Sequence, residues 1–131
     1  MADWNVGDEV PELRVTPDKY LPHRYAGASG DFNPIHIDDE FAKAVGLPRN
    51  ILHGLYSMGL VAKANAVALA GGDPRALKRL SVQFRGMGVP EQEIVVSGTI
   101  RSVDGDRIVV DTVAAQGDTQ IIKNAEAEIQ L

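Results

Sequence analysis

Cysteine is absent from the 131-residue chain, which excludes a disulfide framework, a thiolate nucleophile and a cysteine-ligated metal. Positive charge is also scarce, because 13 Lys and Arg residues stand against 18 Asp and Glu residues, giving a net charge of −5. Binding to nucleic-acid phosphates requires a basic face, so we expect no nucleic-acid partner. The first residues, Met1 to Asn5, carry an acid and lack an apolar run. We therefore expect no secretory signal and a cytoplasmic location.

The longest apolar segment covers residues 51–70 and is just long enough for a membrane span. Fourteen of these twenty residues are apolar, but many of them are only weakly apolar alanines. Lys63 near the middle would cost about 2.5–3.5 kcal/mol at a bilayer centre, and Asn65 lies two residues further on. Apolar residues on nearly every face indicate instead a helix enclosed by protein, ended by Gly71-Gly72. We expect a buried central helix and no membrane partner.

The residues before this helix predict one strand and two shorter helices. The strand is expected over residues 6–15. A helix is expected from Pro17 to about residue 26, because proline suits the first helical position. Acidic residues at 38–40 favour the start of another short helix, which runs through residue 45 and is closed by Gly46.

The residues after the long helix predict four antiparallel strands. In the first, apolar residues at 80, 82 and 84 alternate with polar ones. The dipeptide Asp104-Gly105 is a strong hairpin signal between strands over 93–103 and 107–115, and Gly117-Asp118 marks the next turn. In the last strand, over 119–131, alternation predicts one buried and one solvated face. The residues expected on the buried face are Ile121, Ala125, Ala127 and Ile129. The residues expected on the solvated face are Ile122, Asn124, Glu126, Glu128 and Gln130.

The most informative stretch runs from Tyr25 to His36 and places Asp31 five residues before His36. Pro34 lacks a backbone N–H and pushes Asn33 toward extended geometry, so we expect a turn that cannot be helix. The carboxylate and the imidazole then converge from two sides of a loop and can hold one water between them. A purely structural Asx turn is the alternative. Small residues over 27–30 and the later pair His53-Gly54 favour function.

The same stretch, read from Tyr25 to Asp38, resembles the motif of the MaoC-like, or hydratase-2, branch of the hotdog superfamily. That motif runs aromatic, small residues, Gly-Asp-x-Asn-Pro-aliphatic-His-x-Asp, and the chain matches it at every central position. The resemblance continues through residues 41–47 and 51–55 and, more weakly, over essentially the whole chain, with the short dehydratase subunits of fatty-acid elongation as its nearest likeness. It implies an α+β protein, a single hotdog domain over 1–131 with an antiparallel sheet wrapped around a long central helix.

The resemblance also implies an activity, which is the reversible hydration of trans-2-enoyl thioesters to (3R)-hydroxyacyl thioesters without a consumed cofactor. Asp31 and His36 would activate and return one water. Gly54, in the first turn of the long helix, is our candidate for the oxyanion hole, because backbone N–H groups there lack helical partners. Tight packing is the alternative role for this glycine. Asn33 and Ser29 are candidates for fixing the loop.

For other polar residues near the motif, the sequence predicts supporting roles. His53 is expected to satisfy a local hydrogen bond rather than perform chemistry. Tyr56 and Ser57 lie on the long helix and are candidates for lining the site. No metal site is expected, because the sequence His36-x-Asp38-Asp39 lacks a second histidine at ligand spacing.

One basic stretch stands out in the acidic chain, with no acid among its intervening residues: Arg75, Lys78, Arg79 and Arg85. These residues are candidates for binding the phosphates of acyl-CoA or the acidic surface of an acyl carrier protein, while solvated surface charge is an equally good reading. The resemblance further implies at least two hotdog folds per particle, so we expect a homodimer or a heterodimer with a related hotdog subunit.

Two other functions remain open from the sequence. A hotdog thioesterase would need its acid on the long helix, and residues 51–70 contain no Asp or Glu. A non-catalytic acyl-binding subunit would not need the intact motif from Asp31 to His36.

Overall fold

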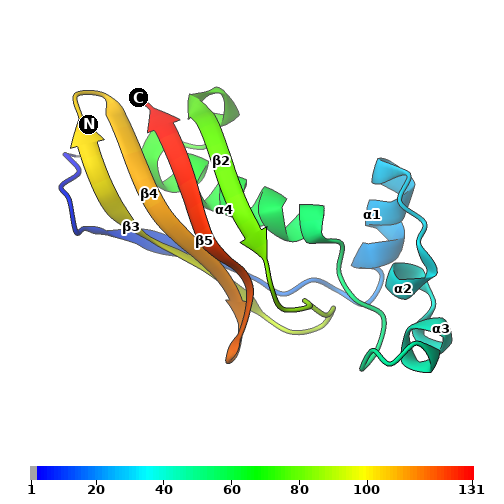
Figure 1. Ribbon diagram of the computed structural model, residues 1–131. Helices are drawn as coiled ribbons and strands as arrows, with labels where there is room; N and C mark the ends of the chain where they lie inside the picture. The colour runs from blue at the N-terminus through cyan, green and yellow to red at the C-terminus, as the bar shows by residue number, and fades with distance from the viewer. Residues whose placement is uncertain (1–2) are drawn as a thin grey trace.

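The computed structural model describes residues 3–131, which form one antiparallel sheet with a long helix, α4, packed against one face (Figure 1). The strand order across the sheet is β1-β3-β4-β5-β2, so β1 and β2 are the two edges. The α+β class is therefore confirmed. The strands are β1 (Glu9–Val15), β2 (Leu77–Phe84), β3 (Ile94–Asp104), β4 (Arg107–Gln116) and β5 (Thr119–Gln130).

Helix α4 (Gly54–Ala70) packs against one face of the sheet, and its buried side chains join the apolar side chains of the strands. The expectation of a helix enclosed by protein on nearly every face was wrong in part, because Leu55 and Val67 are exposed. Val61, which is fully buried, packs in one cluster with Ile94 and Ile122. The helix ends at Gly71, whose φ of 60° is left-handed. It begins three residues later than the apolar run suggests, because residues 51–53 are extended and bonded to other loops, with Leu52 N donating to Gly88 O at 2.8 Å.

Three short helices gather at the end of the molecule where α4 begins, and both chain termini lie at the opposite end (Figure 1). They are α1 (Leu21–Ser29), α2 (Pro34–Ile37) and α3 (Asp39–Ala44), and a 3₁₀ turn, η1 (Pro74–Ala76), precedes β2. At the far end, a second cluster of buried side chains includes Leu69, Ile100 and Ile129. Trp4 packs against this cluster and lines a pocket with Leu69 and Leu131.

Two further predicted element starts were wrong. The first helix begins at Leu21 rather than Pro17, because the Pro17 carbonyl is used to accept the Glu91 N–H at 2.7 Å, and the proline of the first helical turn is Pro22. The first strand begins at Glu9 rather than at residue 6, because residues 6 and 7 form a turn, with φ of 92° at Gly7.

The expectation that the Asp31–His36 segment contains no helix was wrong in part. Pro34–Ile37 form a single helical turn that includes His36. Asn33 is extended as predicted, with φ of −55° and ψ of 128°, and it caps this turn. Proline is compatible with the turn because it occupies the first helical position, where its missing N–H would have no helical partner.

The predicted alternation in the last strand was wrong at its start. Ile122 was expected on the solvated face but is fully buried, next to the buried Ile121. The cause is an irregularity in the pairing of β5 with β4 and β2, next to Asn124, whose φ of 49° is left-handed. An extra residue in one strand shifts the side-chain period, so the alternation is regular only from Ala125 onward.

Candidate active site

Asp31 lies in consecutive short turns that are held by hydrogen bonds between residues close in the sequence. Its backbone N–H donates to Ser29 Oγ at 3.2 Å, and its Oδ1 accepts the Asn33 N–H at 3.2 Å. Asn33 Oδ1 in turn accepts the Ile35 N–H at 3.2 Å and so caps α2. These bonds fix the Asp31 loop while its second carboxylate oxygen, Oδ2, stays free of them. Ser29 and Asn33 therefore lie where a loop-fixing role requires them.

His36 is buried and its ring is oriented by the main chain. Its Nδ1 lies 2.9 Å from the Ile51 carbonyl oxygen. A carbonyl only accepts, so Nδ1 carries the proton and Nε2 presents a lone pair. Nε2 lies 3.7 Å from Asp31 Oδ2, which is too long for a direct hydrogen bond but lets one water contact both atoms. The predicted convergence of the acid and the imidazole is present in the structure.

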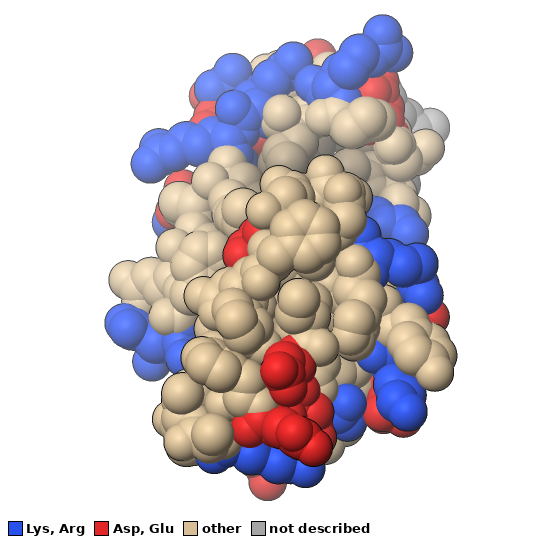
Figure 2. All heavy atoms as spheres, turned by 90° about the vertical axis from the view of Figure 1, so that its right-hand side faces the viewer, with Lys and Arg blue, Asp and Glu red and all other residues tan. Residues whose placement is uncertain are grey.

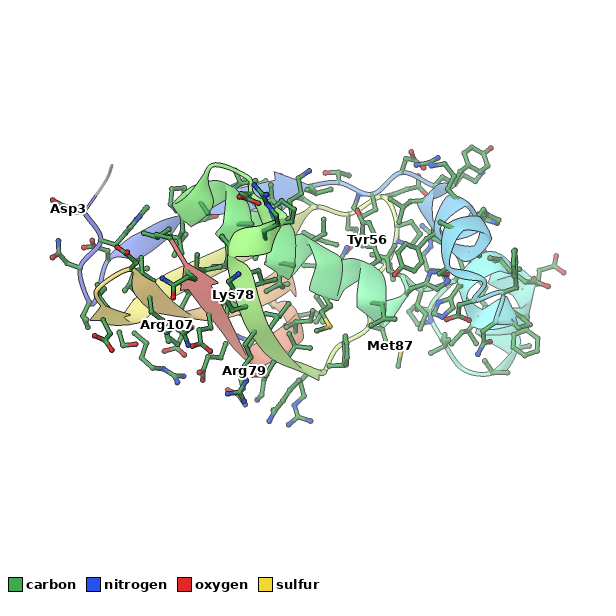
Figure 3. All side chains as sticks on the ribbon, turned by 90° about the horizontal axis from the view of Figure 1, so that it is seen from above. Asp3, Tyr56, Lys78, Arg79, Met87 and Arg107 are labelled. Carbon is green, nitrogen blue, oxygen red and sulfur yellow. The ribbon has the colours of Figure 1, made fainter. Side chains whose placement is uncertain are left out.

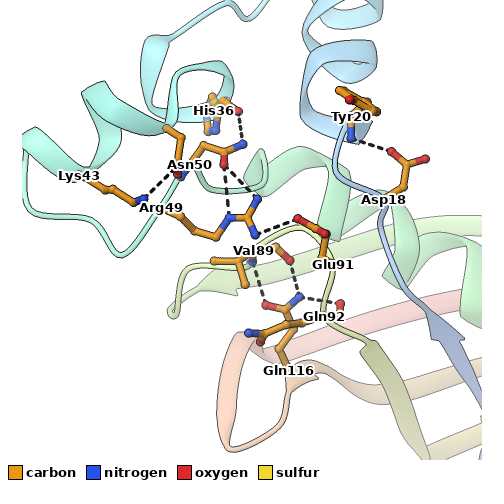
Figure 4. Close-up of polar contacts among 11 residues, drawn as sticks. Asp18, Tyr20, His36, Lys43, Arg49, Asn50, Val89, Glu91, Gln92 and Gln116 are labelled. Atoms are coloured by element: carbon orange, nitrogen blue, oxygen red, sulfur yellow. Dashed lines mark hydrogen bonds and ion pairs between the residues drawn. The ribbon is translucent and has the colours of Figure 1, made fainter.

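Asn50 supports this histidine and was missed by the sequence analysis. Its buried side-chain amide donates to the His36 carbonyl at 2.9 Å (Figure 4). Its backbone N–H donates to Asp39 Oδ1 at 3.0 Å. Arg49 bonds the amide oxygen of Asn50 and forms an ion pair with Glu91 at 3.1 Å. The hydrogen bonds to Lys43 and to the Asn50 N–H lower the pKa of the Asp39 carboxyl. The signal in the sequence was a polar pair, Arg49-Asn50, directly before an apolar run.

The loop that carries Glu91 is fixed to the sheet. Gln116, at the end of β4, accepts the Val89 N–H at 2.9 Å and donates to the carbonyls of Val89 and Gln92 at 2.8 and 3.0 Å (Figure 4). A series of polar contacts therefore connects the sheet, through Glu91 and Arg49, to the turn that holds His36.

His53, the residue before α4, contacts both members of the pair. Its Nε2 lies 3.0 Å from the backbone carbonyl oxygen of Asp31. Its ring stacks on the His36 ring with centroids 3.8 Å apart and an angle of 22° between the planes. On its other side the Tyr25 ring lies at 4.7 Å. His53 thus forms a hydrogen bond, as the sequence predicted, but with a carbonyl 22 residues away rather than with a local group.

A pocket of about 280 Å³ opens beside this cluster and is lined by Tyr25, Ser29, Asp31, His53, Gly54, Leu55 and Phe84. Gly54 is the first residue of α4, where its N–H points out of the helix end. A Cβ at position 54 would lie 3.1 Å from two ring carbons of Phe84, so glycine lets this ring pack against the start of α4, which is the packing role that the sequence left open beside the oxyanion role. His36 lies behind Asp31 and is not part of the pocket lining.

Tyr56 and Ser57, the two other residues of α4 that were candidates for lining the site, differ in their position relative to this pocket. Ser57 is buried on α4 and is not part of the lining. Tyr56 is half-buried near α1, where its ring contacts Tyr25 edge-on at 5.9 Å (Figure 3). Burial raises the pKa of the Tyr56 hydroxyl, and the Asp18 carboxylate raises it further.

The four basic candidates are distributed along one edge of the sheet and do not form a compact cluster. Arg75 lies in η1 and pairs with Asp73 at 3.1 Å. Arg79 pairs in register with Glu128, and its side chain points away from α4 (Figure 3). Arg85 directly follows Phe84, the pocket residue at the other end of β2. At about 3.3 Å per residue, the eight-residue strand separates its two ends by roughly 23 Å, so Arg85 is the basic candidate next to the pocket.

Asp31, His36 and His53 are the group among residues 3–131 whose ligand atoms, all within 4.8 Å of one another, could hold a metal. The two imidazoles are stacked almost parallel, so their in-plane lone pairs run side by side and do not converge on one point. Binding a metal with both rings would require one of them to rotate and to give up its bond to a carbonyl.

The end of the molecule formed by α1–α3 presents a largely uncharged surface, with Lys and Arg at its margins and acids near one edge (Figure 2). Several large apolar side chains are exposed in this part of the chain, among them Phe32, Leu55, Phe84 and Met87. Across residues 3–131, every helix is too short or too polar to cross a membrane.

Comparison with known proteins places the chain and its fold in one family. The model of the MaoC-like domain matches residues 6–123, and the chain belongs to that family. Its structure superimposes with a TM-score of 0.92 on a solved MaoC-like dehydratase that is 32% identical, covering 98% of this chain and 41% of that one. An (R)-hydratase from A. caviae, 21% identical, has the same fold over 100% of this chain and 99% of its own, with a TM-score of 0.87. The hotdog architecture is thereby confirmed.

Curated relatives add sequence likeness over most of the chain. The peroxisomal enoyl-CoA hydratase 2 of Arabidopsis thaliana is 39% identical over 103 residues, which are 79% of this chain and 31% of the relative. The enoyl-CoA hydratase ChsH3 of Mycobacterium tuberculosis is 35% identical over 119 residues, which are 88% of this chain and 40% of the relative. The chain thus spans less than half the length of these two relatives.

Proposed function

We propose that the chain catalyses the reversible hydration of trans-2-enoyl thioesters to (3R)-hydroxyacyl thioesters. The observation that carries the proposal is the separation of 3.7 Å between Asp31 Oδ2 and His36 Nε2, beside a pocket that Gly54 also lines. An acid, a base and a backbone N–H at the positive end of a helix are the groups that this reaction needs. Family membership and the likeness to two enoyl-CoA hydratases support the same reaction.

In the hydration direction, a water held between Asp31 and His36 gives a proton to the pair while its oxygen attacks the β-carbon. Negative charge moves to the thioester oxygen, where the Gly54 N–H stabilises it. The pair then gives a proton to the α-carbon on the same face, so that H and OH have been added across the double bond. Dehydration is the reverse sequence. Positioned proton transfer of this kind contributes about 10²–10⁴-fold.

The two alternatives fit the site less well. A thioesterase that uses an acid on the long helix has none here, because α4 contains no Asp or Glu. A non-catalytic acyl-binding subunit would have no use for the four ordered hydrogen bonds that hold Asp31, Asn33 and His36 in place.

We propose further that the particle contains two hotdog units, as a homodimer or with a related subunit, and that the thioester carrier is CoA or an acyl carrier protein. A solved neighbour is the ChsH1-ChsH2 complex of Mycobacterium tuberculosis, 23% identical with a TM-score of 0.85, covering 97% of this chain and 98% of that one. The exposed apolar residues around the pocket support a covered surface at this end.

The test is incubation of the purified protein with crotonyl-CoA and longer enoyl-CoAs, following the loss of enoyl absorbance and the chirality of the product. We expect the (3R)-hydroxyacyl product and no release of free thiol. Thiol release with no loss of the double bond would instead indicate a thioesterase. Binding of an enoyl-CoA with neither change would indicate an acyl-binding subunit.

A further inference from the structure

His53 is the buried titratable group that the proposed reaction leaves unused. Only 2% of the residue is exposed, yet it contacts the catalytic pair twice, through the Asp31 carbonyl and through the His36 ring. No other side chain among residues 3–131 forms a hydrogen bond or a ring contact with both residues. This double contact indicates a role in the reaction beyond local packing.

The hydrogen bonds define the state of this ring. The Asp31 carbonyl only accepts, so Nε2 of His53 carries the proton. Its Nδ1 is buried and has no hydrogen-bond partner in the described part of the chain. A second proton on Nδ1 would create a buried cation without an acceptor, which is costly. The titratable groups facing the ring are Asp31, His36 and Tyr25, and none of them forms a hydrogen bond with Nδ1.

We propose that His53 is a positioning residue, kept neutral, which fixes the Asp31 loop through its Nε2–H and gives His36 an uncharged ring to stack on. The inference rests on the proposed function, because the hydration step is what places a proton on His36. A neutral neighbour permits that charge, whereas a charged one would oppose it. The hydrogen bond to the Asp31 carbonyl sets the position of the carboxylate in the same residue.

Two variants separate the two contacts. His53→Phe keeps a stacking ring and removes the donor, while His53→Gln keeps an N–H donor and removes the ring. We expect each to lower kcat on crotonyl-CoA at least about tenfold and to change KM less than about threefold, because small displacements of catalytic groups affect the chemical step more than binding. Retention of half the wild-type kcat by either folded variant would overturn the proposal.

His23 offers a matched control, because its Nε2 also bonds a backbone carbonyl, that of Ile37 at 3.1 Å, but it is exposed and its ring contacts Tyr20 rather than Asp31 or His36. We expect His23→Phe to keep kcat within about twofold of wild type. An equal loss in His23→Phe and His53→Phe would show a general effect on folding and would also overturn the proposal.

A measurement that needs no turnover separates this inference from the proposed function. Nitrogen-15 NMR of the wild-type imidazoles should show His53 as the neutral Nε2–H tautomer at about pH 7. A doubly protonated or Nδ1–H His53 would overturn the inference even in an active enzyme. A wild-type protein that leaves crotonyl-CoA and longer enoyl-CoAs unchanged would instead overturn the proposed function, whatever the tautomer.

Discussion

At the level of single residues, Asp31 and His36 differ in burial, with side-chain exposures of 53% and 10%. The acid faces the pocket and the histidine lies behind it, so one water can contact both. We expect Asp31→Asn and His36→Ala each to lower kcat at least about a hundredfold while the protein stays folded. Circular dichroism confirms the fold and enoyl-CoA turnover gives the rate.

The double variant adds a second measurement to the same assignment. Because the two side chains act on one water, the loss in the double variant should be far smaller than the product of the single losses. A loss of kcat in the double variant equal to the product of the two single losses would contradict the assignment. Near wild-type turnover in either folded single variant would also contradict it.

Among the residues that hold His36 in place, Asn50 is the one whose substitution should have the largest effect on stability and on kcat. Asn50→Ala leaves the His36 carbonyl without its side-chain donor, so we expect a loss of about 1–3 kcal/mol in the free energy of unfolding and a fall in kcat of at least about tenfold. Thermal and urea unfolding measure the first and initial rates the second.

Asn65 supplies the control for this experiment. It is a second buried asparagine, and its amide donates to the Val61 carbonyl at 2.9 Å in the middle of α4. Asn65→Ala should lose similar stability while kcat per folded molecule stays within about twofold. A fall in kcat common to both variants would show that destabilisation alone explains it.

The sequence was sufficient to predict that the Asp31 carboxylate and the His36 imidazole come together, because these residues and Asn33 lie within one short segment, where spacing determines contact. The roles of Asn50 and His53 were not predictable in the same way. Their bonds reach 14 and 22 residues back along the chain, to the carbonyls of His36 and Asp31. Such contacts depend on how loops dock, and a single sequence carries no periodic signal for them.

At the level of elements, the start of α4 combines a helix end with a glycine under an aromatic ring. Gly54→Ala would place a Cβ 3.1 Å from Phe84, so this ring, which also lines the pocket, must shift by a few tenths of an ångström. We expect kcat/KM to fall at least about tenfold, because the N–H that faces the developing charge becomes less accessible. Steady-state kinetics with crotonyl-CoA and a longer enoyl-CoA provide the measurement.

Gly59, on the same helix, is the matched position. An added Cβ there meets no atom within 4 Å. Gly59→Ala should therefore stabilise the helix by up to about 1 kcal/mol and leave turnover unchanged. Equal kinetic effects of the two substitutions would mean that the oxyanion site is elsewhere.

Element types were predicted well from the sequence and element boundaries less well. The hairpin at Asp104-Gly105 and the acidic start of α3 follow local rules, and both are present as expected. The starts of α1 and β1 and the face of Ile122 were wrong, because tertiary contacts or an irregular strand pairing overrode the local pattern. The contact that shifts the start of α1 joins distant parts of the chain, whereas the turn at Gly7 and the irregularity beside Asn124 lie close to the residues that they affect.

At the level of the whole molecule, charge near the pocket should influence how the thioester carrier binds. Arg85 adjoins the pocket residue Phe84, whereas Arg75 lies beyond the other end of β2 and is paired with Asp73. We expect Arg85→Glu to raise KM for enoyl-CoA about fivefold or more with kcat nearly unchanged, and Arg75→Glu to have little effect. Initial rates at two salt concentrations test this, since screening should reduce the difference.

An enoyl thioester of N-acetylcysteamine lacks the phosphates and serves as the second substrate. Wild type and Arg85→Glu should process it equally. Equal losses on both substrates would show that Arg85 acts through local structure, and the reading of the basic residues as solvated surface charge would be the correct one.

The two sheet edges, β1 and β2, bear on assembly, because an unpaired edge invites pairing with another chain. We expect a homodimer of about twice 14.1 kDa, unless a related subunit takes the second place. Light scattering across a dilution series, with activity measured in parallel, checks this. A monomer that retains full activity at all concentrations would contradict it.

The position of Trp4 has a practical consequence for spectroscopy. It is the single tryptophan of the chain, and it packs at the end of the core remote from α1–α3. Its fluorescence should therefore change little when ligand enters the pocket but strongly when the far end of the core opens. The protein carries an intrinsic optical reporter of global unfolding that is insensitive to what happens at Asp31 and His36.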